Sequence, residues 1–136
     1  MRELSSPCKI AVVQAAPVLF DRALSTQKAI DLIRTAAGHG AELVVLPELY
    51  IPGYPYGMTF GFTVGARSEA GRQDWKRYYD NSILVPGEET AALAAVAGGL
   101  GVYVSIGVSE RGAFTATLYT TNLGFSPGGR PGCVHP

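Results

Sequence analysis

Glu48 is the residue whose type and position in this sequence best suit acid–base chemistry. It lies in the run VVLPEL at residues 44–49 and follows an apolar segment directly. Pro47 restricts Leu46 to an extended conformation and cannot donate to a strand ladder, so a buried strand is predicted to end there. In α/β sheets, ligand-binding crevices open beyond the carboxyl ends of the strands. The sequence therefore places a carboxylate where a general base could act.

Aromatic residues follow Glu48 and could form a wall around its side chain. These residues are Tyr50, Tyr54, Tyr56 and Phe60. Such a wall would take water away from the carboxylate, which is the environment that suits a general base near neutral pH. A simpler interpretation is also open, in which Glu48 is a solvated acid at a strand end or caps the next segment. The GYPYG motif at 53–57 likewise has two interpretations, a rigid pocket wall or a packed surface turn.

Four other features that could carry chemistry have plainer structural interpretations. His39 lies between two glycines at an expected helix end, where a solvated cap is the simpler role. The GGLG run at 98–101 follows a predicted helix instead of opening one, so it lacks the arrangement of a phosphate-binding loop. Cys8 is expected to be a small hydrophobic residue at a strand edge. Cys133 lies in a tail rich in glycine and proline that gives no strand or helix to orient it beside a base, so it is not expected to be a nucleophile.

The composition narrows the class of protein. The chain has 136 residues, of which 47% are hydrophobic and 16% are charged, which suits one globular domain. The formal net charge of zero gives no basic surface for a nucleic acid or an anionic membrane. The two cysteines form no CxxC motif and no histidines are paired, which argues against a disulfide framework or a metal site. With no long apolar run and no secretory leader pattern, we expect a cytoplasmic protein.

The apolar pattern predicts a mixed α/β domain. Strands are expected at 9–16, 41–46, 102–108 and 114–126, and helices at 21–38, 69–79 and 88–97. Asp21 is placed to cap the first helix, which with its flanking strands forms a βαβ-like unit. A turn at 110–112 would make the last two strands an antiparallel pair. The first strand is expected to be mostly buried, and the residues after Ser126 to be irregular.

Together these segments resemble successive blocks of the nitrilase superfamily of carbon–nitrogen hydrolases. The blocks are KIAVVQAAPV, the helix after Asp21, AELVVLPE, IPGYPYG, GRQDWKRYYDNSILVP and TLYTTNLGFSPGGR. They follow one another in order from about residue 9 to residue 130, before an irregular tail at 131–136. The GYPYG motif and the block at 71–87 resemble the nitrilase branch more than the amidase or carbamoylase branches. The resemblance implies an αββα sandwich, of which residues 1–136 would form about the first half.

The resemblance also implies a mechanism that needs no metal or organic cofactor. Members of the family use a glutamate, a lysine and a cysteine to convert a nitrile to a carboxylic acid and ammonia. The cysteine thiolate attacks the nitrile carbon, the glutamate takes the thiol proton and later activates water, and the lysine stabilises the tetrahedral intermediate. Carried over to this sequence, Glu48 takes the position of the general base. Tyr54 falls in the block that usually lines the nitrile pocket.

The sequence departs from the family pattern after Arg130. No lysine follows Lys76, and Cys133 comes too early and in the wrong context to be the nucleophile. We therefore expect a truncated gene product that is inactive alone and prone to self-association. The alternative is a non-catalytic fragment or assembly subunit. A nucleotide-binding module is disfavoured, because APVLFDR follows the first strand where a glycine-rich turn would be needed.

Overall fold

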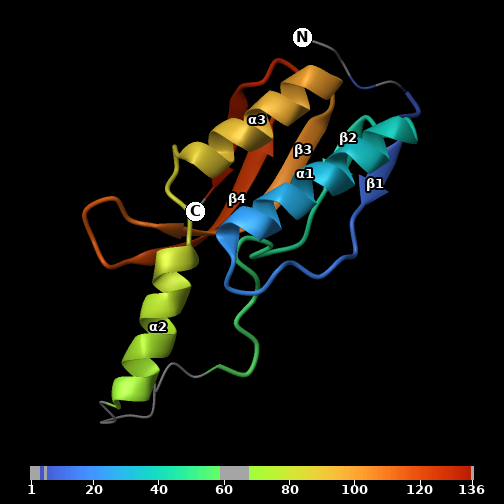
Figure 1. Ribbon diagram of the computed structural model, residues 1–136. Coiled ribbons are helices and arrows are strands. Elements are labelled where there is room, and N and C mark those ends of the chain that lie inside the picture. The colour runs from blue at the N-terminus through green and yellow to red at the C-terminus, as the bar shows by residue number, and fades with distance from the viewer. Residues whose placement is uncertain (1–3, 5, 59–67, 136) are drawn as a thin grey trace.

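A sheet covered by helices on one face organises the chain (Figure 1). The computed structural model describes residues 4, 6–58 and 68–135. The elements in chain order are β1 (Ile10–Val12), α1 (Arg22–Gly38), β2 (Leu43–Val45), α2 (Glu69–Asn81), α3 (Glu88–Leu100), β3 (Tyr103–Arg111), β4 (Leu118–Phe125) and β5 (Pro131–His135). Their order confirms the mixed α/β class.

The sheet has the strand order β1-β2-β3-β4-β5. The first three strands are parallel, with Val44 of β2 opposite Ala11 of β1 and Val104 of β3. β4 runs antiparallel to β3, and β5 runs antiparallel to β4. The predicted βαβ unit and the predicted antiparallel pair are therefore confirmed. The turn between β3 and β4 is longer than expected, because the second strand of the pair begins only at Leu118.

The helices form where local signals place them. Asp21 caps α1, and its carboxylate accepts a hydrogen bond of 2.8 Å from the Leu24 N–H. His39 is the C-cap of the same helix, as its glycine neighbours indicated. α3 begins with Glu88 and Glu89, whose charges favour a helix N-terminus, and is capped after Leu100 by Gly101 in the left-handed conformation.

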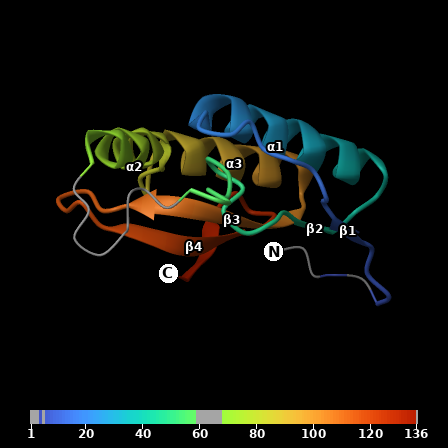
Figure 2. The same ribbon diagram turned by 90° about the horizontal axis from the view of Figure 1, so that it is seen from below.

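The core lies between the sheet and the two helices α1 and α3. Its fully buried side chains include Ala29, Ile33, Val44, Leu93, Ala97, Ile106, Val108 and Leu123. Figure 2 shows α1 and α3 side by side on one side of the sheet, and α2 extends past the end of the sheet in Figure 1. None of the helices in the described part of the chain combines the length and the hydropathy of a membrane span.

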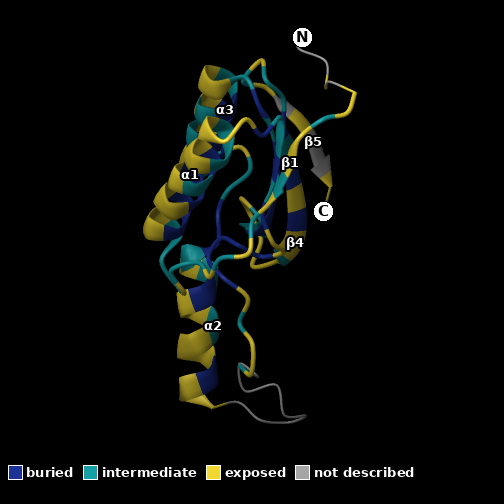
Figure 3. Cartoon of the chain, turned by 90° about the vertical axis from the view of Figure 1, so that its right-hand side faces the viewer, coloured by how far each residue is buried: buried dark blue, intermediate teal, exposed yellow. Residues whose placement is uncertain are grey.

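The opposite face of the sheet carries no described helix, as the edge-on view of Figure 3 shows. This arrangement corrects the expectation that the first strand is mostly buried. Ile10 is 51% exposed and Val12 is 80% exposed, whereas Ala11 between them is half-buried against the core. Alternate residues of a strand point to opposite faces, so one face of β1 packs on the helices and the other stays open.

The end of the chain also differs from the expectation. The irregular tail predicted at 131–136 contains β5, which pairs Val134 with Leu123 and Cys133 with Gly124. Hydrogen bonding to the edge of β4 needs only backbone groups, so this strand forms without a hydrophobic period in its sequence.

Candidate functional site

Glu48 lies just beyond the carboxyl end of β2, where the sequence predicted it. β2 ends at Val45, and the chain then runs along β3 instead of leaving the sheet. The Leu46 N–H donates to the Ser105 carbonyl at 2.8 Å, and the Tyr50 N–H donates to the Gly107 carbonyl at 2.8 Å. Glu48 is therefore held between two anchor points on the neighbouring strand.

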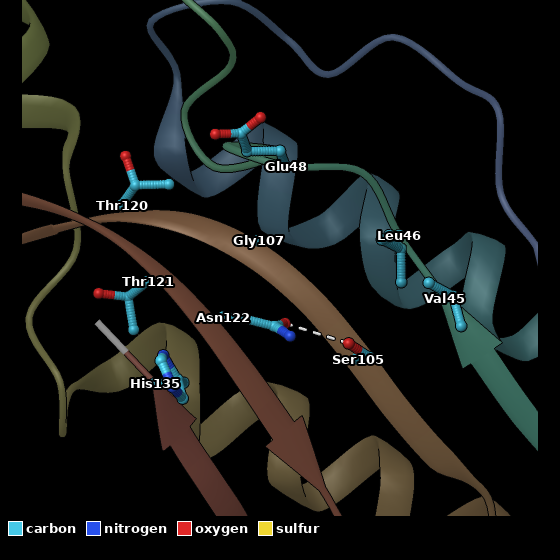
Figure 4. A pocket seen from close by; sticks show the side chains of 9 residues that line it. All are labelled: Val45, Leu46, Glu48, Ser105, Gly107, Thr120, Thr121, Asn122 and His135. Atoms are coloured by element: carbon cyan, nitrogen blue, oxygen red, sulfur yellow. Dashed lines mark hydrogen bonds between the residues drawn. The ribbon is translucent and has the colours of Figure 1, made fainter.

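The Glu48 carboxylate lies at the rim of a pocket of about 410 Å³ (Figure 4). The pocket is lined by Val45, Leu46, Glu48, Ser105, Gly107, Thr120, Thr121, Asn122 and His135. Ser105 and Asn122 lie on β3 and β4 respectively, and the Ser105 hydroxyl donates to the Asn122 Oδ1 at 3.0 Å. These side chains alternate with core residues along their strands, so the pocket opens on the helix-free face of the sheet.

The aromatic wall expected around Glu48 is not what the described residues form. Glu48 is exposed, Tyr50 is buried in the core, and Tyr56 is 91% exposed. No tyrosine lines the pocket, and Phe60 lies outside the described residues. Leu49 adopts a left-handed φ of 48°, and the Tyr50 side chain that follows it packs into the core. The carboxylate is accordingly solvated on this open face.

The GYPYG motif behaves partly as a surface turn. Tyr54 is 54% exposed, whereas Pro52 and Gly53 are buried. The assignment of Tyr54 to a substrate pocket stays a prediction.

Tyr78 lies near the predicted site residues, although the sequence did not single it out as a candidate. It lies on α2, is 5% exposed, and its hydroxyl donates to the Gly53 carbonyl at 3.2 Å. Burial raises the pKa of Tyr78 and the nearby Tyr54 and Glu48 side chains add to the increase, while a hydrogen bond with Ser109 lowers it. Tyr78 therefore responds to the electrostatics of both predicted site residues. Its place in the WKRYY run was the one available signal.

The remaining candidates lie apart from this pocket. In the described part of the chain, no cluster of three His, Cys, Asp or Glu side chains could hold a metal ion. Cys8 is a free, half-buried thiol. The backbone of Cys133 has a regular position in β5, so the sequence argument that no strand orients it was wrong. None of the three lysines lines the pocket, and the Lys9 Nζ instead donates to the His39 carbonyl at 2.6 Å.

Solved structures share this fold. The chain aligns with Nit3 of Saccharomyces cerevisiae, a member of branch 10 of the nitrilase superfamily, at a TM-score of 0.66 and 23% identity. That alignment covers 94% of this chain and 43% of the yeast chain. An amidase from Nesterenkonia sp. aligns at a TM-score of 0.61 and 16% identity, over 93% of this chain and 41% of the amidase. At these identities the likeness establishes the fold alone, as one part of a nitrilase-type sandwich.

Sequence comparisons identify the family. The chain is 48% identical over 124 residues to an aliphatic nitrilase of Sinorhizobium fredii, covering 91% of this chain and 40% of that enzyme. It is 43% identical over 122 residues to the bifunctional nitrilase/nitrile hydratase NIT4A of Lupinus angustifolius, covering 90% of this chain and 34% of that protein. The chain thus spans well under half the length of these relatives. The carbon–nitrogen hydrolase family model matches residues 9–135. The resemblance seen in the sequence is therefore confirmed, and this chain belongs to the carbon–nitrogen hydrolase family.

Proposed function

We propose that this chain supplies the general-base segment of a nitrilase-type hydrolase that converts a nitrile to a carboxylic acid and ammonia. The observation that carries the proposal is the position of Glu48, beyond the carboxyl end of β2 and at the rim of a pocket. A carboxylate at this place can accept a proton from a thiol and later from water. The 48% identity to an aliphatic nitrilase supports nitriles as the substrate class.

Glu48 alone does not complete this chemistry. The family mechanism also needs a cysteine to form the bond to the nitrile carbon and a lysine to stabilise the charge on nitrogen. The pocket of this chain offers hydroxyl and amide groups from Ser105, Thr120 and Asn122, and none of the three lysines lines it. We therefore propose that the 136-residue chain alone releases no ammonia from nitriles, and that activity requires the two missing groups.

A hybrid enzyme tests the catalytic proposal. In the hybrid, this chain replaces the 124 residues that it matches in the Sinorhizobium fredii aliphatic nitrilase. The hybrid should release ammonia from an aliphatic nitrile, and Glu48→Gln should lower kcat by about 10²- to 10⁴-fold. Glu88→Gln is the matched control, because Glu88 is an exposed carboxylate on α3 that does not line the pocket. An equal rate for Glu48→Gln and Glu88→Gln would contradict the proposed role.

An assembly role is the second candidate, and the open sheet face favours it. Val12 and Ile10 expose apolar surface on β1, which is also an edge strand of the sheet. Exposed apolar faces and unpaired strand edges promote association with other chains. We propose that the isolated chain self-associates through this face. Sedimentation velocity over a range of concentrations tests this, and a single monomeric species at all concentrations would contradict it.

A further inference from the structure

Gly107 on β3 lies against the backbone that carries Glu48. A Cβ atom at this position would lie 2.6 Å from the Glu48 Cα, 2.8 Å from the Leu49 nitrogen and 2.8 Å from the Pro47 oxygen. All three atoms belong to the backbone, so no side-chain rotation could relieve these contacts. The label of Gly107 lies close to Glu48 in Figure 4, where both residues border the pocket. Only glycine permits such a close approach of two backbone segments.

The segment between Val45 and Ile51 forms a bulge beside β3. Val45 pairs with Ser105, and Ile51 next pairs with Val108. The segment therefore advances six positions while β3 advances three, so its extra residues cannot all pair with β3. Glu48 lies in the middle of this bulge.

Hydrogen bonds to Gly107 close the bulge from both sides. The Gly107 N–H donates to the Pro47 carbonyl at 3.2 Å, and its carbonyl accepts the Tyr50 N–H at 2.8 Å. Between these bonds, Leu49 has a left-handed φ of 48° and a buried side chain. A leucine holds this backbone conformation only where the surroundings enforce it. Gly107 therefore holds the bulge on both sides of Glu48.

We propose that Gly107 is a positioning residue for the Glu48 carboxylate, and the inference rests on the proposed function of Glu48 as general base. A methyl group at position 107 would push the Glu48 Cα away from β3 and move the carboxylate out of line with its proton donor. Displacement of a reacting group by about 1 Å can lower a rate by about 100-fold. Substrate binding by other parts of the pocket would change little.

The test uses the hybrid nitrilase defined above. Gly107→Ala should lower kcat by about 100-fold and leave KM within about twofold. Gly99→Ala is the matched control, because no atom lies within 4 Å of a Cβ built at Gly99. It should leave both constants unchanged. A Gly107→Ala hybrid with an unchanged kcat, or with a raised KM and unchanged kcat, would overturn the proposal.

Comparing kcat for Glu48→Gln and Gly107→Ala separates a failure of the proposed function from a failure of the positioning role. If Glu48→Gln leaves kcat unchanged, the proposed function fails whatever Gly107→Ala does. If Glu48→Gln abolishes activity while Gly107→Ala retains it, only the positioning role fails.

If Gly107→Ala shows no cooperative melt, the variant does not fold and its kcat cannot test the positioning role. Amide hydrogen exchange in the unsubstituted 136-residue chain then tests whether Gly107 holds the bulge. The Tyr50 and Gly107 N–H groups should be protected as strongly as the Ser109 N–H, which donates to the Ile51 carbonyl at 2.7 Å. Rapid exchange of the Tyr50 amide would overturn the proposal.

Discussion

The buried Tyr78 hydroxyl donates a hydrogen bond to the Gly53 carbonyl and so joins α2 to the segment that follows Glu48. The two residues are 25 positions apart in the sequence. Because α2 extends past the end of the sheet, this bond helps to fix the helix to the site region (Figure 1). The contact explains why a tyrosine, and not only an apolar ring, suits this position.

Tyr78→Phe should therefore destabilise the chain. The substitution removes a hydrogen bond from a buried carbonyl, which costs about 1–2 kcal/mol of unfolding free energy. Urea denaturation followed by circular dichroism measures the difference. Tyr56→Phe is the control, since Tyr56 is 91% exposed and its loss of a hydroxyl should change nothing. Equal stabilities for the two variants would contradict the role of the Tyr78 hydroxyl.

Tyr50→Phe should stabilise the chain, in contrast to Tyr78→Phe. The Tyr50 side chain is 1% exposed, and its hydroxyl has no hydrogen-bond partner among the described residues. Removing an unsatisfied buried hydroxyl should raise the unfolding free energy by about 1 kcal/mol. The same urea titration checks the sign, and a loss of stability would mean that the hydroxyl has a partner.

Stability should fall in alkaline solution. Burial raises the pKa of both Tyr50 and Tyr78 in the folded chain. The unfolded chain then loses these protons first, so their contribution is complete below about pH 10 and is lost as the pH rises through the folded values. Urea midpoints between pH 8 and pH 11 would show the decline. The urea midpoints of the Tyr50→Phe and Tyr78→Phe variants should each fall less steeply with pH. If neither variant changes the slope, the two tyrosines are not the cause of the decline.

Val12→Lys should reduce self-association. The substitution places a charge on the open face of the edge strand β1, where it disfavours edge-to-edge and face-to-face contacts. Leu24→Lys is the matched control, because Leu24 is an exposed leucine on α1 and lies away from this face. Sedimentation velocity should show a shift toward monomer for Val12→Lys alone.

Local signals in the sequence were enough to predict much of the fold. Asp21 and Glu88 mark helix starts by their side-chain chemistry, and Pro47 marks the end of β2, so these boundaries needed no tertiary information. The exposure of Val12 depends on which face of the sheet the helices cover. β5 depends on a free edge of β4. Neither the exposure of Val12 nor the formation of β5 can be predicted from the hydrophobic periodicity of the sequence.

The site divides in the same way. The VVLPE run was sufficient to place Glu48 beyond a strand end. The prediction of an aromatic wall was wrong, because Tyr50 packs into the core and Tyr56 lies exposed, which the sequence pattern does not specify. Gly107 could not be found from the sequence, since its contact with Glu48 joins residues about 60 positions apart and involves backbone atoms alone.

Chemical rescue gives the most direct test of Glu48 as the general base. In this chain Glu48 is exposed at the rim of a pocket. Glu48→Ala in the hybrid nitrilase removes the carboxylate, and a small carboxylate from solution could take its place. Added formate should raise ammonia release by Glu48→Ala in proportion to its concentration, and should leave the unsubstituted hybrid and Glu88→Ala unchanged. A Glu48→Ala hybrid that is fully active without formate would contradict the account, as would one whose residual rate is insensitive to formate.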